Sequence, residues 1–171
     1  TLLPKLDQYG YKITQYFATT YIENNPAEQY KVLAFAGAGH EIGSHSITHP
    51  FLTQVSDIQL ETELRDSQQF LKDLTGQEIK HFATPYGDYD AWVISNIQKY
   101  YSSNRNTDAG YNKKESFDIN NIRVQNMTRT TQASEVQSWI DQAQADNAWL
   151  VIVYHKIADN PDPYDTTPEN F

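Results

Sequence analysis

Short segments of strand character alternate along this chain with segments of helical periodicity. The strand-like segments are rich in β-branched and aromatic residues, whereas the helical ones repeat apolar residues every three or four positions. We expect strands at 11–18, 39–45, 79–83 and 149–155, and helices at 1–10, 27–36, 56–75, 93–101 and 134–143. This alternation predicts an α/β protein of parallel βαβ units, arranged as an open sheet or as a barrel.

Two of the helices carry more detailed predictions. Ser56 followed by Gln59 matches a capping pattern, and Gly76 is a stop signal for the same helix. Its repeating apolar residues are Leu60, Leu64, Leu71 and Leu74. The last helix is expected to begin at a cap on Thr131 or Ser134. Its predicted buried face consists of Val136, Trp139, Ile140 and Ala143.

The run WLVIVYH at 149–155 is the most apolar segment of the chain. Continuous apolar runs are typical of strands buried on both faces. The tail at 159–170 has three prolines and no periodicity, which predicts a loop or a departing linker. A length of 171 residues with 39% hydrophobic residues suits one core, so we predict a single domain over 1–171.

Composition excludes several classes of protein. A net charge of −9 disfavours a nucleic-acid surface, which needs clustered Lys and Arg. The chain has no cysteine, so any metal site must use histidine and carboxylate ligands. No apolar run approaches the ~20 residues of a membrane span, and the first residues lack the order of a signal peptide. Twelve tyrosines and three tryptophans suit sugar stacking.

Chemically capable residues follow three of the predicted strands. His45 and His49 stand four residues apart, a spacing at which two imidazoles can bind one divalent ion; the alternative is a pair of polar loop residues. In ATPYG at 83–87, Pro85 stiffens the turn and Gly87 would let the backbone pass close to a ligand; the alternative is an ordinary turn. His155 ends the apolar run, where it could donate a proton or be a structural core histidine.

Together these segments resemble an ordered set of family motifs. GHEIGSHSITHP resembles the second motif of the NodB-type polysaccharide deacetylases, carbohydrate esterase family 4, while TPYG resembles the third and WLVIVYHKI the fifth. TDAGYN at 107–112 also looks like this family, so the resemblance covers nearly all of the chain. It implies a distorted (β/α) barrel that removes N- or O-acetyl groups from peptidoglycan, a chitin-like polymer, xylan or an exopolysaccharide.

The resemblance also implies roles for individual residues. His45 and His49 would bind a divalent metal, expected to be zinc, and no organic cofactor is implied. The backbone N–H of Tyr86 would stabilise the oxyanion, and His155 would protonate the leaving group. Pro85 and Ile152 would line the substrate pocket. The expected partner is an acetylated polysaccharide, at an extracellular or cell-surface location.

Three departures from the family pattern keep an alternative open. The family's two adjacent aspartates, which follow its first strand, are absent, so we expect a fragment incomplete at its N-terminus and also at its C-terminus. Ala83 stands where the family has an arginine that pairs with the catalytic aspartate. In the fourth motif, Asp108 could orient His155, or Arg105 could substitute for the missing arginine. The alternative function is an inactive, deacetylase-like carbohydrate-binding domain.

One further alternative function and the two remaining histidines complete the sequence analysis. An unrelated α/β hydrolase would need a Gly-x-Ser-x-Gly elbow, which the chain lacks. The resemblance assigns no ligand role to His40, which we interpret as structural, and His81 is expected to point into or beside the sheet.

Overall fold

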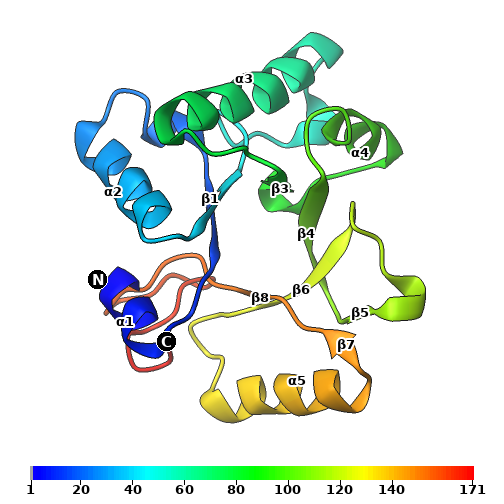
Figure 1. Cartoon of the computed structure of the whole chain (residues 1–171). Helices are drawn as coiled ribbons and strands as arrows, with labels where there is room; N and C mark the ends of the chain where they lie inside the picture. Colours follow the sequence, from blue (N-terminus) through cyan, green and yellow to red (C-terminus); the bar gives the residue numbers. More distant parts are fainter. Residues whose placement is uncertain (1) are drawn as a thin grey trace. The chain divides into compact units, whose positions relative to one another are not determined.

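The structure, a computed structural model, describes residues 2–171 as two compact units, the first ending at Asn104 and the second comprising Arg105–Phe171 (Figure 1). None of the described helices is long and apolar enough to cross a membrane. The single domain expected over 1–171 stays a prediction.

The first unit contains three neighbouring parallel strands. They are β1 (Thr14–Phe17), β2 (Glu41–Ser44) and β3 (His81–Ala83). Tyr16 is in register with Gly43, and Ser44 with Phe82, so all three strands end at the same edge. Within this unit β2 is the only described strand paired with β1. That a further strand precedes β1 stays a prediction.

Helices and short 3-10 turns precede, connect and follow these strands. They are α1 (Leu2–Tyr9), η1 (Thr19–Tyr21), α2 (Pro26–Gly37), η2 (Leu52–Gln54), α3 (Asp57–Thr75), η3 (Pro85–Gly87) and α4 (Ala91–Ile97). Both α2 and α3 pack against β2. The predicted signals of α3 are confirmed: the Ser56 hydroxyl accepts a hydrogen bond from the Gln59 amide at 3.3 Å, and Gly76 ends the helix at φ 70°.

The hydrophobic core of this unit lies between the helices and strands. Its fully buried members include Val32, Ile42, Leu60, Leu64, Leu71, Phe82, Val93 and Ile97. Three of the four leucines predicted on α3 are in this set, and Leu74 packs against it. Helical periodicity therefore identified the buried face of α3 correctly.

The second unit contains both parallel and antiparallel strand pairings. Its elements are β4 (Ser103–Ala109, which begins in the first unit), β5 (Asn112–Lys113), η4 (Lys114–Ser116), β6 (Ile122–Asn126), α5 (Ala133–Ala145), β7 (Ala148–Trp149) and β8 (Ile152–Val153). Strand β6 pairs in parallel with β4 and β8, whereas β5 and β7 form an antiparallel pair. Since α5 connects parallel β6 and β8, the predicted βαβ organisation is confirmed.

The structure corrects the predicted start of α5 and the predicted burial of its inner face. The helix begins after Gln132, whose side chain makes no cap hydrogen bond, so neither Thr131 nor Ser134 caps it. The Thr131 hydroxyl instead accepts the Thr128 amide, at 3.1 Å, within the preceding turn. The predicted inner face of α5 is its least exposed face, but of its four residues only Ala143 is buried. Val136, Trp139 and Ile140 are partly exposed.

The apolar run at 149–155 is not one strand buried on both faces. Trp149 pairs with Asn112 of β5, whereas Ile152 pairs with Gln125 of β6, so the chain changes partners between them. Only Val153 in the run is buried. The tail is irregular as predicted, although an isolated bridge joins Ile157 to Thr166.

Candidate active site

The loop after β2 carries the predicted metal ligands. The His45 amide continues the pairing with β1 by donating to the Phe17 carbonyl at 2.9 Å. The amides of Thr19 and Thr20 in η1 then donate to the carbonyls of Ser46 and Ile47, at 3.1 and 3.0 Å. The backbone of this loop is therefore fixed on the side facing η1.

This loop is strained at two positions. Ser46 and His49 have φ values of 65° and 59°, in the left-handed region that non-glycine residues rarely occupy. Such residues cost on the order of 1–3 kcal/mol each and persist where surrounding contacts hold them. Here the Ser46 hydroxyl accepts the His49 amide at 3.0 Å, which closes the turn between the two histidines.

The two imidazole rings converge. Nε2 of His45 lies 3.0 Å from Nε2 of His49, and the rings meet edge to face. Nδ1 of His45 lies 2.6 Å from the Ala83 carbonyl oxygen, which can only accept. Nδ1 therefore carries a proton, and in the neutral form of the ring the lone pair of His45 Nε2 points toward His49.

The donor set fits two ligands of a zinc ion. Two nitrogens at about 2.1 Å from one tetrahedral ion lie about 3.4 Å apart, close to the separation of the two Nε2 atoms. A backbone carbonyl that fixes the other ring nitrogen is also typical of metal-binding histidines. In the described part of the chain, no group of three or more His, Cys, Asp or Glu could hold a metal. Metal binding by His45 and His49 stays a prediction.

A buried carboxylate on α3 contacts the same loop. Glu63 is 3% exposed, and its Oε2 accepts the backbone amides of Ile47 and Thr48 at 2.8 and 2.9 Å. Its Oε1 accepts the Thr48 hydroxyl at 2.5 Å. The loop is thus held from α3 as well as from η1.

An aromatic pair adjoins the histidines. The rings of Phe51 and Tyr86 stack with centroids 4.3 Å apart, and the His49 ring meets Tyr86 edge to face at 4.4 Å. Phe51 is 46% exposed and Tyr86 55%. The Asp88 carboxylate, directly after η3, accepts hydrogen bonds from the Thr53 amide at 2.8 Å and from the Thr53 hydroxyl. These bonds join η3 to η2, which contains Thr53.

The turn that follows β3 lies beside the histidine pair. Tyr86 has φ 57° and ψ 1°, an unusual backbone conformation for a non-glycine residue. Pro85 is buried in this turn, and Ala83, which stands at the family's arginine position, is fully buried. Thr84 donates to the Asn104 side-chain oxygen at 2.9 Å, so this segment is anchored internally.

The other predicted site residues lie in the second unit. Arg105 is buried on β4, and its guanidinium approaches the Asn106 carbonyl at 3.5 Å. The Asp108 carboxylate accepts from the Asn106 side-chain amide at 3.3 Å. Ile152 is half-buried on β8. The roles of Arg105, Asp108 and Ile152 stay predictions.

The surroundings of His155 differ from both readings of the sequence. This residue lies beyond the end of β8 and is exposed, so it is neither delivered directly by a buried strand nor a core histidine. Its ring tilts against Tyr164, with centroids 5.9 Å apart. Its role as a proton donor stays a prediction.

Sequence reasoning missed Glu63, Phe51 and Asp88. The signal for Glu63 was available, because it lies between Leu60 and Leu64, on the buried face of a helix where an unpaired acid is rarely found. Phe51 and Asp88 gave no comparable signal, since their partners come from a loop 35 residues away in the chain.

The fold and this site define a class: a parallel α/β protein with a histidine pair at the carboxyl end of its strands, where βα units place their chemistry. The family profile described as polysaccharide deacetylase matches residues 1–102. The chain therefore belongs to the polysaccharide deacetylase family. The matched region includes the histidine motif and the TPYG turn, and it ends before β4.

A relative with a deacetylase name agrees with this assignment. The peptidoglycan-N-acetylglucosamine deacetylase of Bacillus cereus is 30% identical over 89 residues, which are 51% of this chain and 30% of that protein. The chain thus spans less than a third of this relative.

Two solved structures show the same fold. The deacetylase PplD of Streptococcus pyogenes, in complex with acetate, has a TM-score of 0.72 and 20% identity over 79% of this chain and 61% of that one. A carbohydrate esterase family 4 pseudoenzyme from Bacillus anthracis has a TM-score of 0.58 and 13% identity over 89% of this chain and 57% of that one. The predicted NodB-type fold class is confirmed.

Proposed function

We propose that this protein is a metal-dependent hydrolase that removes N- or O-acetyl groups from a polysaccharide at the cell surface or outside the cell. The observation that carries the proposal is the convergence of His45 and His49, whose Nε2 atoms lie 3.0 Å apart while the Ala83 carbonyl fixes the opposite edge of His45. Membership of the deacetylase family supports the reaction type.

Residues of this chain would perform part of the hydrolysis, and the proton of the attacking water would pass to one of the two adjacent aspartates that the family resemblance implies and this sequence lacks. His45 and His49 would hold the ion, and a bound zinc ion supplies Lewis acidity toward water and an acetyl carbonyl. The Tyr86 amide would donate to the oxyanion, a contact commonly worth about 3 kcal/mol of the barrier. His155 would protonate the leaving amine or alkoxide, with Pro85 and Ile152 lining the pocket. Asp108 would orient His155, or Arg105 would replace the family's arginine.

The aromatic pair beside His49 supports a polysaccharide substrate. The rings of Phe51 and Tyr86 are both about half exposed although they stack on each other. Exposed aromatic rings offer a flat apolar surface to the C–H face of a sugar. A sugar bound there would lie next to the histidine pair, as an acetylated residue of a polymer must.

Acetate release from an acetylated chito-oligosaccharide by the full-length protein, with zinc content measured in parallel, tests this function. We expect His45→Ala and His49→Ala each to remove bound zinc and activity together. Each variant keeps only one of the two histidine ligands, which is too few to hold zinc tightly. Turnover that survives in both variants, or in protein stripped of metal by a chelator, would contradict the proposal.

The second candidate is an inactive domain that binds carbohydrate. It is favoured by the buried methyl group of Ala83, at the position where the resemblance leads us to expect an arginine. The same assay separates the two candidates. A full-length protein that binds the oligosaccharide but releases no acetate with zinc, cobalt or manganese would support the binding domain.

A further inference from the structure

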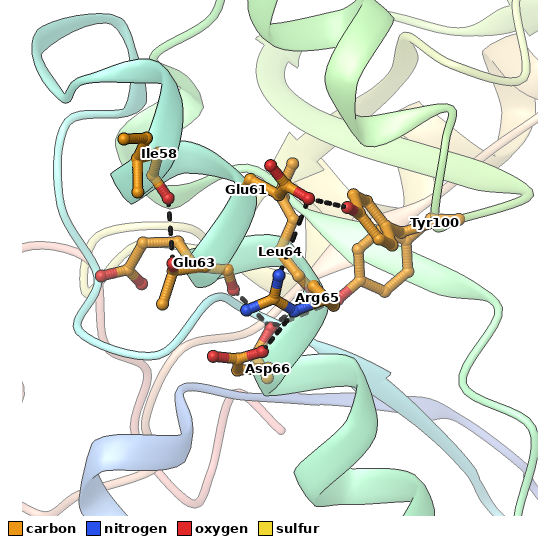
Figure 2. A network of polar contacts seen from close by, with 10 residues as sticks. Ile58, Glu61, Glu63, Leu64, Arg65, Asp66 and Tyr100 are labelled. Atoms are coloured by element: carbon orange, nitrogen blue, oxygen red, sulfur yellow. Dashed lines mark hydrogen bonds and ion pairs between the residues drawn. The ribbon is translucent and has the colours of Figure 1, made fainter.

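Glu63 differs from the other acids of its helix. Glu61 and Asp66 lie on an exposed face, where Arg65 contacts them at 3.7 and 2.7 Å. Figure 2 shows the Glu63 side chain pointing away from this network. Its carboxylate is buried and is directed instead at the loop that carries the histidines.

The contacts of Glu63 fall between the two predicted ligands. It accepts the amides of Ile47 and Thr48, which lie within the four-residue interval from His45 to His49. The residues that flank these amides, Ser46 and His49, have the strained left-handed backbone. A buried acceptor for two successive N–H groups fixes the course of the backbone at that point, and so the direction in which the His49 side chain leaves it.

We infer that Glu63 is the positioning residue that holds the His45–His49 loop in its metal-binding conformation and thereby sets metal affinity. This inference rests on the proposed function, because it assumes that the histidine pair binds an ion. Glu63 itself is not a ligand in this scheme. It acts through the backbone of Ile47 and Thr48.

Hydrogen-bond geometry predicts an unusual order among substitutions of Glu63. Glutamine keeps the length and one carbonyl oxygen for the two amides, and its NH2 group can donate to the Thr48 hydroxyl, which can also accept. Aspartate keeps the charge but is one methylene shorter, and alanine has no acceptor. We therefore expect Glu63→Gln to bind metal nearly as well as the parent and Glu63→Asp to bind it more weakly.

Cobalt titration of the full-length protein, followed by the visible spectrum of the bound ion, tests this order. We expect Glu63→Ala to bind Co²⁺ about 10- to 100-fold more weakly, the usual effect of losing a partner that supports a ligand. Its spectrum should also change. The matched control is Glu61→Gln on the exposed face, which should titrate like the parent.

A second variant and a metal-free measurement cover the case in which Glu63→Ala does not fold. Thr48→Val removes only the hydroxyl hydrogen bond of an exposed residue and should weaken Co²⁺ binding by a smaller factor. In metal-free protein, we expect the Ile47 and Thr48 amides of Glu63→Gln to exchange hydrogen as slowly as those of the parent, and those of Glu63→Asp to exchange faster.

The outcomes separate this inference from the proposed function. Parent-like cobalt affinity and spectrum in folded Glu63→Ala, or aspartate outperforming glutamine, would overturn the positioning role alone. Lower thermal stability with unchanged metal affinity would also overturn it, since the role would then be structural. A parent protein that binds no cobalt would instead refute the proposed metal site, and the inference with it.

Discussion

At the scale of single residues, His155 stands apart from the other histidines. All five lie in the described part of the chain, and only His155 is exposed. His40 is buried. Nε2 of His81 lies 2.9 Å from a Glu41 carboxylate oxygen, and Nδ1 of His81 lies 2.6 Å from the Ser103 hydroxyl. His155 is therefore exposed to solvent, as the proposed proton donor to a large polymer must be.

Replacing His155 gives the sharpest test of the proposed chemistry. We expect His155→Ala to lower turnover about 10²- to 10⁴-fold, the usual contribution of a general acid, while zinc content and folding remain unchanged. Deacetylase rates and metal analysis on the same sample measure both effects. His81→Gln, which changes a histidine outside the proposed site, should leave turnover unaltered. Equal rates for His155→Ala and the parent would remove His155 from the mechanism.

At the scale of elements, a buried tyrosine connects α3 to the chain that follows α4. The Tyr101 hydroxyl donates to the Leu64 carbonyl at 2.7 Å and lies 3.2 Å from the Ser67 hydroxyl. Its ring packs on Phe82. Burial raises the pKa of Tyr101 to about 12. The phenol is thus held in its neutral, hydrogen-bonded form.

Tyr101→Phe should keep the ring packing and lose only the hydroxyl. We expect the free energy of unfolding to fall by about 1 kcal/mol, since the Leu64 carbonyl loses a buried donor. Urea denaturation near neutral pH measures this loss. Tyr100→Phe, whose hydroxyl bonds exposed Glu61, is the control and should change stability much less. Equal losses in the two variants would contradict a special role for Tyr101.

At the scale of the whole molecule, stability should depend on pH through His40. Burial lowers the pKa of His40, Lys12 lowers it further, and Asp7 opposes them. Nδ1 of this ring also accepts the Ile13 amide at 3.3 Å, which requires the neutral form. The unfolded chain therefore binds a proton at a higher pH than the folded chain does.

The sign of the effect follows from that difference. The stabilisation by neutral His40 is complete above the unfolded pKa of about 6.5 and is lost as the pH falls toward the lower folded value. We expect the unfolding free energy of the parent to drop more between about pH 7.5 and about pH 5.5 than that of His40→Asn, which keeps an acceptor for Ile13. Chemical denaturation at both pH values measures this, and identical drops would exclude His40 as the cause.

Local sequence patterns did not predict the strand in which polar residues are buried. Strand β4 contains Asn104, Arg105 and Asn106, all buried, and none of them signals a strand. Their burial depends on partners elsewhere in the chain, such as Thr84 for Asn104. The prediction of one buried strand at 149–155 was wrong for a similar reason. Part of this run pairs with β5 and part with β6, and these partners are distant in the sequence.

The sequence by itself determined α3 and placed two histidines after a strand, because caps, helical periodicity and residue spacing act over a few neighbouring residues. Tertiary structure decided how those histidines are oriented. The carbonyl that fixes His45 comes from Ala83, 38 residues away, and the carboxylate that holds the loop comes from Glu63, 16 residues from Ile47. Hydrogen bonds over such separations depend on how strands and helices pack, which no local pattern encodes.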